Sequence, residues 1–241
     1  MLNKFTAACG LGSVVLCIGS MTLAHKEVVS ANVGAGLFLA SGVLGLLSLC
    51  GVALVLIYTK HYPVALLGVV GLMPLVAAGS ALGAAFQHPR IFDVSTDTAR
   101  VPDFVAALQL PENVGRGMTF PPENASRIAQ GYPELEPLLL NLSPEQAYAR
   151  AVEVAGQMKN WTLDRQDTAK LEFEGVAATK LFRWKSDFIV RVLPADGGRS
   201  KVDMRARSRE EQSDLGANAR WIRGFFKELR QYDLAVPNPA G

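Results

Sequence analysis

The chain has 241 residues, a formal net charge of +2 and 49% hydrophobic residues, and its charges are very unevenly distributed. Before residue 90 the only charged residues are Lys4, Lys26, Glu27 and Lys60, which leaves 21 basic and 21 acidic residues for the rest. The charged part is therefore neutral overall, which argues against nucleic acid as a partner. This division indicates an apolar region followed by a water-soluble domain.

Three uncharged runs make up the apolar region, and each exceeds the roughly 20 residues that a helix needs to cross a bilayer. They predict three transmembrane helices at about 5–24, 35–57 and 63–86, so that residues 1–87 form a transmembrane region. Pro74 is expected to kink the third helix because proline removes a backbone donor. The spans carry no Asp, Glu, Lys or Arg, which disfavours a transporter.

Small residues recur at helix-packing spacing in these spans. Gly79 and Gly83 form a GxxxG motif, and the same spacing separates Gly36 from Ala40 and Ser41 from Gly45. Such positions let helix backbones approach closely. We expect them to pack the three helices within one chain, and the alternative is a homo-oligomer formed through Gly79 and Gly83.

The basic residues near the spans predict the orientation. Lys4 and Lys60 lie on the same side of a three-span topology, and the positive-inside rule places that side in the cytoplasm. The expected location is the cell inner membrane, as a multi-pass protein with its C-terminal domain in the periplasm. Alternatively, the first run is a signal peptide cleaved after Thr22-Leu23-Ala24, which also places the domain outside.

The remainder of the chain divides into three parts. Residues 88–142 are rich in proline and predict an extended arm with a short helix or two. Residues 143–232 predict an α+β domain, and 233–241 a flexible tail. Ser143, Pro144 and Gln146 mark a helix start with a capping box, and the apolar stripe that follows extends to about Lys159.

Four strand-like runs follow this helix, at 161–165, 170–176, 180–193 (continuous or broken near 186) and 200–208. In the last run Val202, Met204 and Ala206 alternate with charged residues, which is typical of a sheet with one buried and one wet face. The residues 195–198 fit a hairpin turn. The predicted fold is a four-stranded antiparallel sheet packed against two helices, of which the second covers 213–230.

Several motifs of this region occur together: Phe92-Asp93-Val94-Ser95-Thr96-Asp97 with Pro102 and Phe104, Tyr132-Pro133, Trp161, and above all VDMRARSREEQSDLGANARWIRGF from Val202 to Phe225. They resemble the family called domain of unknown function 1499, which is found in bacterial envelope proteins and in some photosynthetic eukaryotes. The resemblance extends from His88 to Leu229. It implies a helix and an antiparallel sheet that ends in a second helix, and it implies no activity.

The candidate binding residues come from the last strand and the last helix. They are Arg205, Arg207, Arg209, Ser213, Asp214, Asn218, Arg220 and Arg223. Alternation predicts that the strand arginines, joined by Arg183, Lys185 and Arg191, point to an open sheet face. The favoured interpretation is that Glu172 and Glu174 pair with these cations across strands on a solvated face. The functional alternative is a site for an anionic group, such as a lipid headgroup, a glycan acid or an acidic partner surface. Ser213 as N-cap and Asp214 in the first turn of the helix also have a structural interpretation.

The sequence predicts no catalytic residue, metal site or cofactor. The only histidines are His25, His61 and His88, all at the edges of the spans, so the domain lacks a histidine-based triad or zinc site. The run Asp93-x-Ser95-x-Asp97 resembles a calcium loop, but it has Thr98 at position six and Phe104 at position twelve, where the loop needs Gly and Glu. The two aspartates are expected to be caps and turn anchors.

Three hypotheses for function remain. The first is a non-enzymatic, membrane-anchored protein in contact with membrane lipid, whose domain binds an envelope protein partner or an anionic lipid or glycan. The second is a hydrolase or transferase with its polar centre at Asp214 and Asn218. The third is an accessory subunit of a membrane complex, held through the small-residue faces of its helices.

Overall fold

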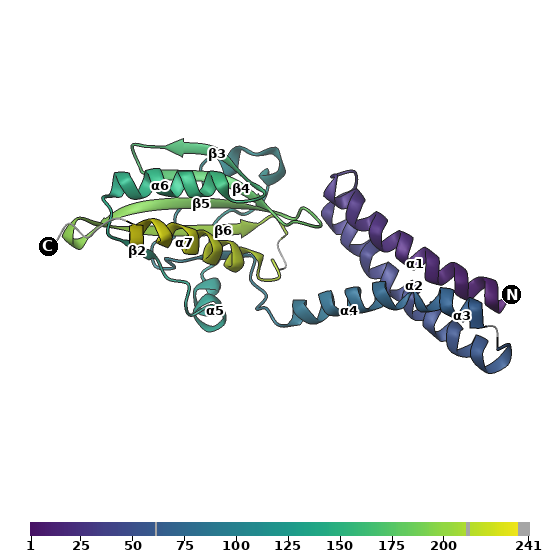
Figure 1. Ribbon diagram of the computed structural model, residues 1–241. Helices are drawn as coiled ribbons and strands as arrows, with labels where there is room; N and C mark the ends of the chain where they lie inside the picture. The colour runs from purple at the N-terminus through teal and green to yellow at the C-terminus, as the bar shows by residue number, and fades with distance from the viewer. Residues whose placement is uncertain (61, 211–212, 236–241) are drawn as a thin grey trace. The chain divides into compact units, whose positions relative to one another are not determined.

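The computed structural model describes residues 1–60, 62–210 and 213–235, which form two compact units (Figure 1). The first unit contains Met1–Gln87 and also Lys180–Arg183. The second contains His88–Thr179 and Trp184–Gly241. The apolar region and the charged domain are thus separate compact units.

The first unit is built from apolar helices. They are α1 (Leu2–His25), α2 (Ala31–Tyr58), α3 (Tyr62–Val69) and α4 (Leu72–Phe86). The segments Leu2–His25, Ala31–Tyr58 and Tyr62–Gly83 are each long and apolar enough to cross a membrane. The prediction of three long apolar helices is therefore confirmed, at nearly the expected positions.

The third apolar segment is broken into α3 and α4, whereas the sequence predicted a single kinked helix. Pro74 has no N–H to donate to the carbonyl of Val70, and its ring crowds that carbonyl. The Val70 carbonyl instead accepts from the N–H of Met73 at 3.3 Å, so the chain makes a tighter turn here than in an α-helix. At the break a Cβ added to Gly45 would lie only 2.3 Å from the carbonyl oxygen of Gly71, so the two backbones pack directly together.

Small residues pack the helices together, but they are only partly the predicted ones. The hydroxyl of Ser48 donates to the carbonyls of Gly68 at 2.8 Å and Thr6 at 3.2 Å, joining three helices. Ser41 and Gly45 are buried, as expected for packing positions. The expectation that Gly79 and Gly83 pack within the chain is wrong, since a Cβ added at either would meet nothing within 4 Å. The same holds for Gly36.

The second unit contains one antiparallel sheet. Its strands are β1 (Asp93–Ser95), β2 (Leu138–Leu140), β3 (Trp161–Asp167), β4 (Glu172–Ala178), β5 (Lys185–Ala195) and β6 (Arg199–Ser208). The order is β1-β6-β5-β4-β3, and β2 also pairs with β6, beside its first residues. The sheet has six strands and not the predicted four, because the segment expected to be an extended arm supplies β1 and β2. Strands of three residues are too short for their alternation to be recognised.

Helices flank the sheet. They are α5 (Glu123–Gly131), α6 (Pro144–Gln157), α7 (Ala217–Ala235) and the single-turn 3-10 helices η1 (Ala107–Gln109), η2 (Pro111–Asn113) and η3 (Asp196–Gly198). The predicted capping box of α6 is present, since Ser143 and Gln146 exchange side-chain to backbone hydrogen bonds. The predicted hairpin turn at 195–198 also forms, around η3. Of the predicted tail, 233–235 belong to α7 and 236–241 lie outside the described residues.

The main hydrophobic core lies between the sheet and the pair α6 and α7, which run side by side over one face (Figure 1). The alternating residues of β6, Val202, Met204 and Ala206, are fully buried there. Trp161 stacks against Phe188 and Phe225 with ring centroids 4.4 and 5.7 Å apart. The helix-facing side of the sheet is therefore the apolar side, as the alternation predicted.

The other face of the sheet is covered by the segment that joins β1 to α5. Phe104, Ala107 and Met118 of this segment form a second small core with Ile189 of β5, and all four are buried. The prediction that this face is open to solvent is therefore wrong. The sheet is enclosed on both sides, and its charged side chains lie beneath the covering segment.

Candidate functional site

The buried polar centre of the domain is Asp93, which joins β1 to β6. The register sets Asp93 opposite Arg207 and Ser95 opposite Arg205. Arg205 donates from Nε and Nη2 to the two carboxylate oxygens of Asp93 at 3.0 and 2.8 Å, and Arg207 donates from Nη1 to Oδ2 at 2.8 Å. Asp93 and Arg205 are fully buried, so one carboxylate is shared by two desolvated cations.

The remaining donors of these arginines hold the covering segment in place. Arg205 donates to the carbonyl oxygens of Pro102 and Met118 at 3.0 and 2.8 Å, and its guanidinium lies 4.6 Å from the ring centre of Phe104. A buried charge is tolerated only when it is paired and hydrogen-bonded in this way. Arg205 therefore fastens the segment onto the sheet.

Two further carboxylates act on the same segment. Glu174 of β4 accepts from the backbone N–H groups of Val105, Ala106 and Ala107 at 2.9 to 3.0 Å, which caps η1. Its ion-pair partner is Arg165 of β3, at 3.2 Å. The expected cross-strand pairing of Glu174 with the arginines of β6 is thus not the arrangement found.

Asp187 of β5 is the second of these carboxylates. It accepts from Arg209 Nη2 at 2.7 Å and from the side-chain amide of Asn113 at 2.9 Å. Asn113 also donates to the carbonyl of Ala107 at 2.8 Å, so the contact reaches from the sheet into η1. Arg209, the third predicted strand arginine, is thus engaged within the fold.

A fourth pair lies at the opposite end of β6. Asp203 is fully buried and accepts from Arg191 Nη2 at 2.8 Å, and burial raises the pKa of its carboxyl. Lys201 donates to Asp97 at 2.9 Å. Burial raises the pKa of Asp97, but the hydrogen bonds from Lys201 and two backbone N–H groups outweigh it and the pKa is lowered. Asp97 Oδ1 accepts from the N–H groups of Ala99 and Arg100, which makes it the predicted turn anchor.

The start of α7 is organised by Asp214. Its carboxylate accepts from the N–H groups of Gly216 and Asn218, both at 2.8 Å, while the Ser213 hydroxyl accepts only from Leu215. The expectation of a helix from 213 with Ser213 as N-cap is wrong, because α7 begins at Ala217. Burial raises the pKa of Asp214.

Gly216 explains why the chain turns before α7. It has a left-handed backbone with φ of +73°, and an added Cβ would lie 2.7 Å from Nδ1 of His88. Glycine is favoured where φ is positive and where another group packs against the backbone. At Gly216 the group that packs against the backbone is the imidazole of His88.

Two buried polar atoms beside this turn have no hydrogen-bond partner among the described residues. They are Oδ1 of Asn218 and the hydroxyl of Tyr132. Asn218 uses its amide to donate to the carbonyl of Phe92 at 3.0 Å, which ties α7 to the start of β1. Burial, followed by the charge of Asp214, raises the pKa of Tyr132 to about 12, so its hydroxyl stays protonated.

Four exposed cations follow one another along α7. We call Arg220, Arg223, Lys227 and Arg230 the basic stripe, and all four are exposed. Arg223 donates to Glu134 and lies 5.2 Å from the ring centre of Tyr132. Lys227 and Arg230 form no ion pair with any described side chain.

The predicted site residues therefore do not form one site. Arg205, Arg207 and Arg209 lie in or at the edge of the covered face of the sheet, whereas α7 packs on the opposite face. Ser213, Asp214 and Asn218 shape the turn before α7, and Arg220 and Arg223 belong to the basic stripe. No pattern in the sequence indicates the contact between Asp187 and Asn113, which only the folded covering segment brings together. Arg191, expected on the open sheet face, pairs with Asp203 on the adjacent strand.

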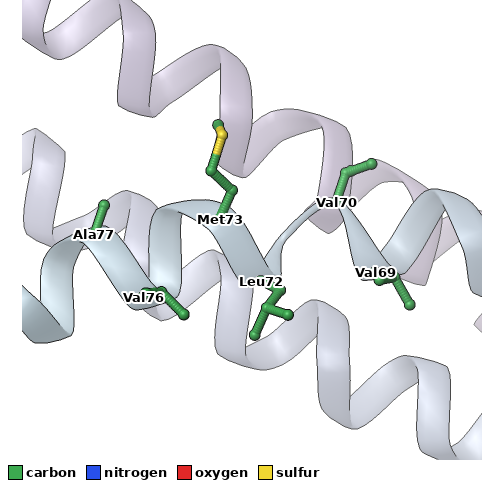
Figure 2. A pocket seen from close by; sticks show the side chains of 6 residues that line it. All are labelled: Val69, Val70, Leu72, Met73, Val76 and Ala77. Atoms are coloured by element: carbon green, nitrogen blue, oxygen red, sulfur yellow. The ribbon is translucent and has the colours of Figure 1, made fainter.

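The hollows on the described part of the chain include one in each unit. One is an apolar groove at the break between α3 and α4, lined by Val69, Val70, Leu72, Met73, Val76 and Ala77 (Figure 2). The other lies between the C-terminal ends of α6 and α7 and is lined by Val154, Gln157, Met158, Lys159, Glu228, Gln231 and Tyr232. In residues 1–60, 62–210 and 213–235, no group of three or more His, Cys, Asp or Glu side chains is placed to hold a metal ion.

Comparison with known proteins identifies the domain. The sequence model of a family described as a protein of unknown function (DUF1499) matches residues 93–229, from β1 to the core of α7. The match contains the Asp93, Arg205 and Arg207 cluster and most of the basic stripe. A search of curated proteins found no match.

Proposed function

Since the chain belongs to the DUF1499 family, a family of unknown function, we propose its role from the geometry of the domain. The protein is a membrane-anchored binding protein, and its domain recognises an anionic partner through the basic stripe. The arrangement of cations on α7 carries this proposal.

The basic stripe has the form of a recognition surface. Its residues follow one another at intervals of three, four and three, so they lie along one flank of α7 over about 15 Å. The neighbouring flank, with Ala219, Ile222 and Leu229, is fully buried, which fixes the rotation of the helix. A row of cations held in this way matches an anion with several charges, and each exposed cation remains available because surface ion pairs are weak.

Asp214 and Asn218, which the enzyme hypothesis takes as the polar centre, both have structural roles. Asp214 caps α7, and Asn218 ties the helix to Phe92. Burial raises the pKa of Asp214, which means that removing this carboxylate from water costs free energy. These contacts support a binding role over hydrolysis or group transfer.

The proposed location is the inner membrane, with the domain in the periplasm. It rests on the three apolar helices and on the positive-inside rule applied to Lys4 and Lys60. The open space in front of Gly79 and Gly83 supports self-association, or assembly into a larger membrane complex, through α4.

The test compares two variants that remove the same charge. In one, all four residues of the basic stripe are changed to Gln, and in the other the exposed cations Arg100, Arg150, Lys170 and Arg199 are changed to Gln. Each full-length protein is purified from its native membrane, and bound proteins and lipids are identified by mass spectrometry. We expect the stripe variant to lose a ligand that the control retains.

The two sources of anionic charge give different results. If the partner is an acidic protein, it should be missing from the protein fraction of the stripe variant. If the partner is an anionic lipid or glycan, it should be missing from the extracted envelope components. Equal retention by the stripe variant and the wild type would contradict the proposal. Equal loss from both variants would show that net charge, and not the stripe, determines binding.

A further inference from the structure

The hairpin loop between β4 and β5 has an unusual composition for a water-soluble domain. Its residues Thr179–Trp184, followed by Lys185 at the start of β5, read Thr-Lys-Leu-Phe-Arg-Trp-Lys. Between Glu174 and Asp187 the chain has no acidic residue, while Lys180, Arg183 and Lys185 are basic. Cations mixed with tryptophan and apolar side chains are typical of segments at a membrane surface.

The loop is closed at its base and projects from the sheet. The N–H of Thr179 donates to the carbonyl of Trp184 at 2.9 Å, and the N–H of Trp184 donates to the Thr179 hydroxyl at 3.0 Å. Arg183 has a left-handed backbone with φ of +61°, which reverses the chain. The compact unit of the domain omits Lys180–Arg183, which are grouped with the apolar helices of the first unit. Within that group Phe182 is buried and Arg183 pairs with Glu27 at 3.5 Å, whereas Leu181 remains exposed.

The tip exposes an apolar side chain. Leu181 is 50% exposed, and only a few large hydrophobic side chains of the domain reach this exposure. Burial of such a side chain in the acyl-chain boundary is favourable, and neighbouring cations add attraction to anionic headgroups. A bilayer surface offers both an apolar boundary for Leu181 and anionic headgroups for the neighbouring cations.

The tether keeps the domain close to a bilayer. If the helices cross the membrane, α4 ends at Phe86 and β1 begins at Asp93, and the connection between them spans at most about 20 Å. The domain therefore stays near the headgroups, where a short projecting hairpin can reach them. We propose that the tip of the β4–β5 hairpin, Lys180–Lys185, inserts into the interface of a bilayer that contains anionic phospholipid. This inference rests on the membrane anchoring of the proposed function, and is independent of the basic stripe.

The test uses the full chain in vesicles whose phospholipids carry bromine near the top of the acyl chain. Bromine quenches tryptophan fluorescence at short range, and the chain has three tryptophans, Trp161, Trp184 and Trp221. We expect about twofold quenching of the Trp184 emission, obtained as the difference between the wild type and Trp184→Phe. Trp161, stacked in the aromatic core, provides an internal unquenched reference.

Two leucines provide matched variants. Leu181 is 50% exposed on the tip and Leu139 is 51% exposed on β2. Leu181→Asp should lower the quenching about twofold, while Leu139→Asp should leave it unchanged. Urea midpoints measured by pulse proteolysis should be unchanged in both variants, because both side chains are exposed.

Charge is tested separately. Wild-type quenching should be stronger in vesicles with phosphatidylglycerol than in pure phosphatidylcholine, and Lys180→Glu combined with Lys185→Glu should remove the difference. Emission from Trp184 that is insensitive to brominated lipid would overturn the proposal and show that protein covers the tip. Equal effects of Leu181→Asp and Leu139→Asp would also overturn it. Loss of a ligand from the stripe variant, by contrast, would leave this result unaffected.

Discussion

At the scale of single residues, arginines that look alike in the sequence have opposite roles. Arg205 is fully buried, and its guanidinium contacts Asp93, Pro102 and Met118. Arg220 on α7 is exposed, and its guanidinium donates to the Leu215 carbonyl at 2.9 Å. The first links a strand to the segment that covers it, whereas the second lies at the surface of α7.

This difference predicts a large effect of Arg205→Gln on stability. Asp93 keeps Arg207, but the change removes two of the three charged hydrogen bonds to this buried carboxylate and takes the charged donor from the Pro102 and Met118 carbonyls. Breaking a buried ion pair is strongly destabilising, and we expect the domain to lose about 3 to 5 kcal/mol of its unfolding free energy. Arg199→Gln changes the same charge at an exposed position of the same strand and should stay within about 0.5 kcal/mol. Pulse proteolysis of the full chain in urea measures both. A stable Arg205→Gln domain would mean that the covering segment holds without this link.

At the scale of elements, α7 shows how a predicted helix is shortened by tertiary contacts. Leu215 falls within the helix predicted for 213–230, but it has a φ of +51° and lies before the first turn of α7. Asp214, and not Ser213, supplies the cap, because Gly216 turns the chain where His88 packs. The apolar face of the helix, which packs on the sheet, is present from Ala219 to Leu229.

The aromatic core under α7 gives the second prediction. Phe225 is fully buried and lies near Trp161 and Phe173, with ring centroids 5.7 and 6.5 Å away. Phe225→Ala should destabilise the domain by about 3 to 5 kcal/mol, because it removes buried area and leaves a cavity. Lys227→Ala, two residues on and exposed, serves as the control. The loss should appear in the urea midpoint with or without any ligand, and an unchanged midpoint would mean that α7 is not part of the stabilising core.

At the scale of the whole molecule, an apolar helical unit and a charged domain are joined by a short connection. The domain encloses its sheet between α6 and α7 on one face and the proline-rich segment on the other. Charge is therefore distributed unevenly at two levels. It differs first between the units, and then within the domain, where Arg205 and Arg207 of β6 are buried while the four cations of the basic stripe are exposed.

The orientation of the chain gives the third prediction. With three spans and a cytoplasmic start, a reporter fused after Gly241 that works only in the cytoplasm should be inactive. A reporter that works only outside the cytoplasm should be active at the same position. The matched fusion after Lys60, in the loop that follows α2, should give the reverse pattern. Cytoplasmic activity at the C-terminus would invert the topology and exclude a periplasmic role.

Local patterns in the sequence were enough to establish the apolar helices, the domain that follows them, the helix at Ser143, the alternation of β6 and the family. Each of these depends on neighbouring residues, through hydropathy, capping or a period of two. The role of the strand arginines depended on a segment about 100 residues earlier in the chain. Only the tertiary structure brings Asp93 and Pro102 to Arg205. The alternation of a strand shows which side chains share a face, but it does not show whether that face meets water. Whether a charged side chain on that face is buried depends on the segment that covers it, and a buried charge must be paired.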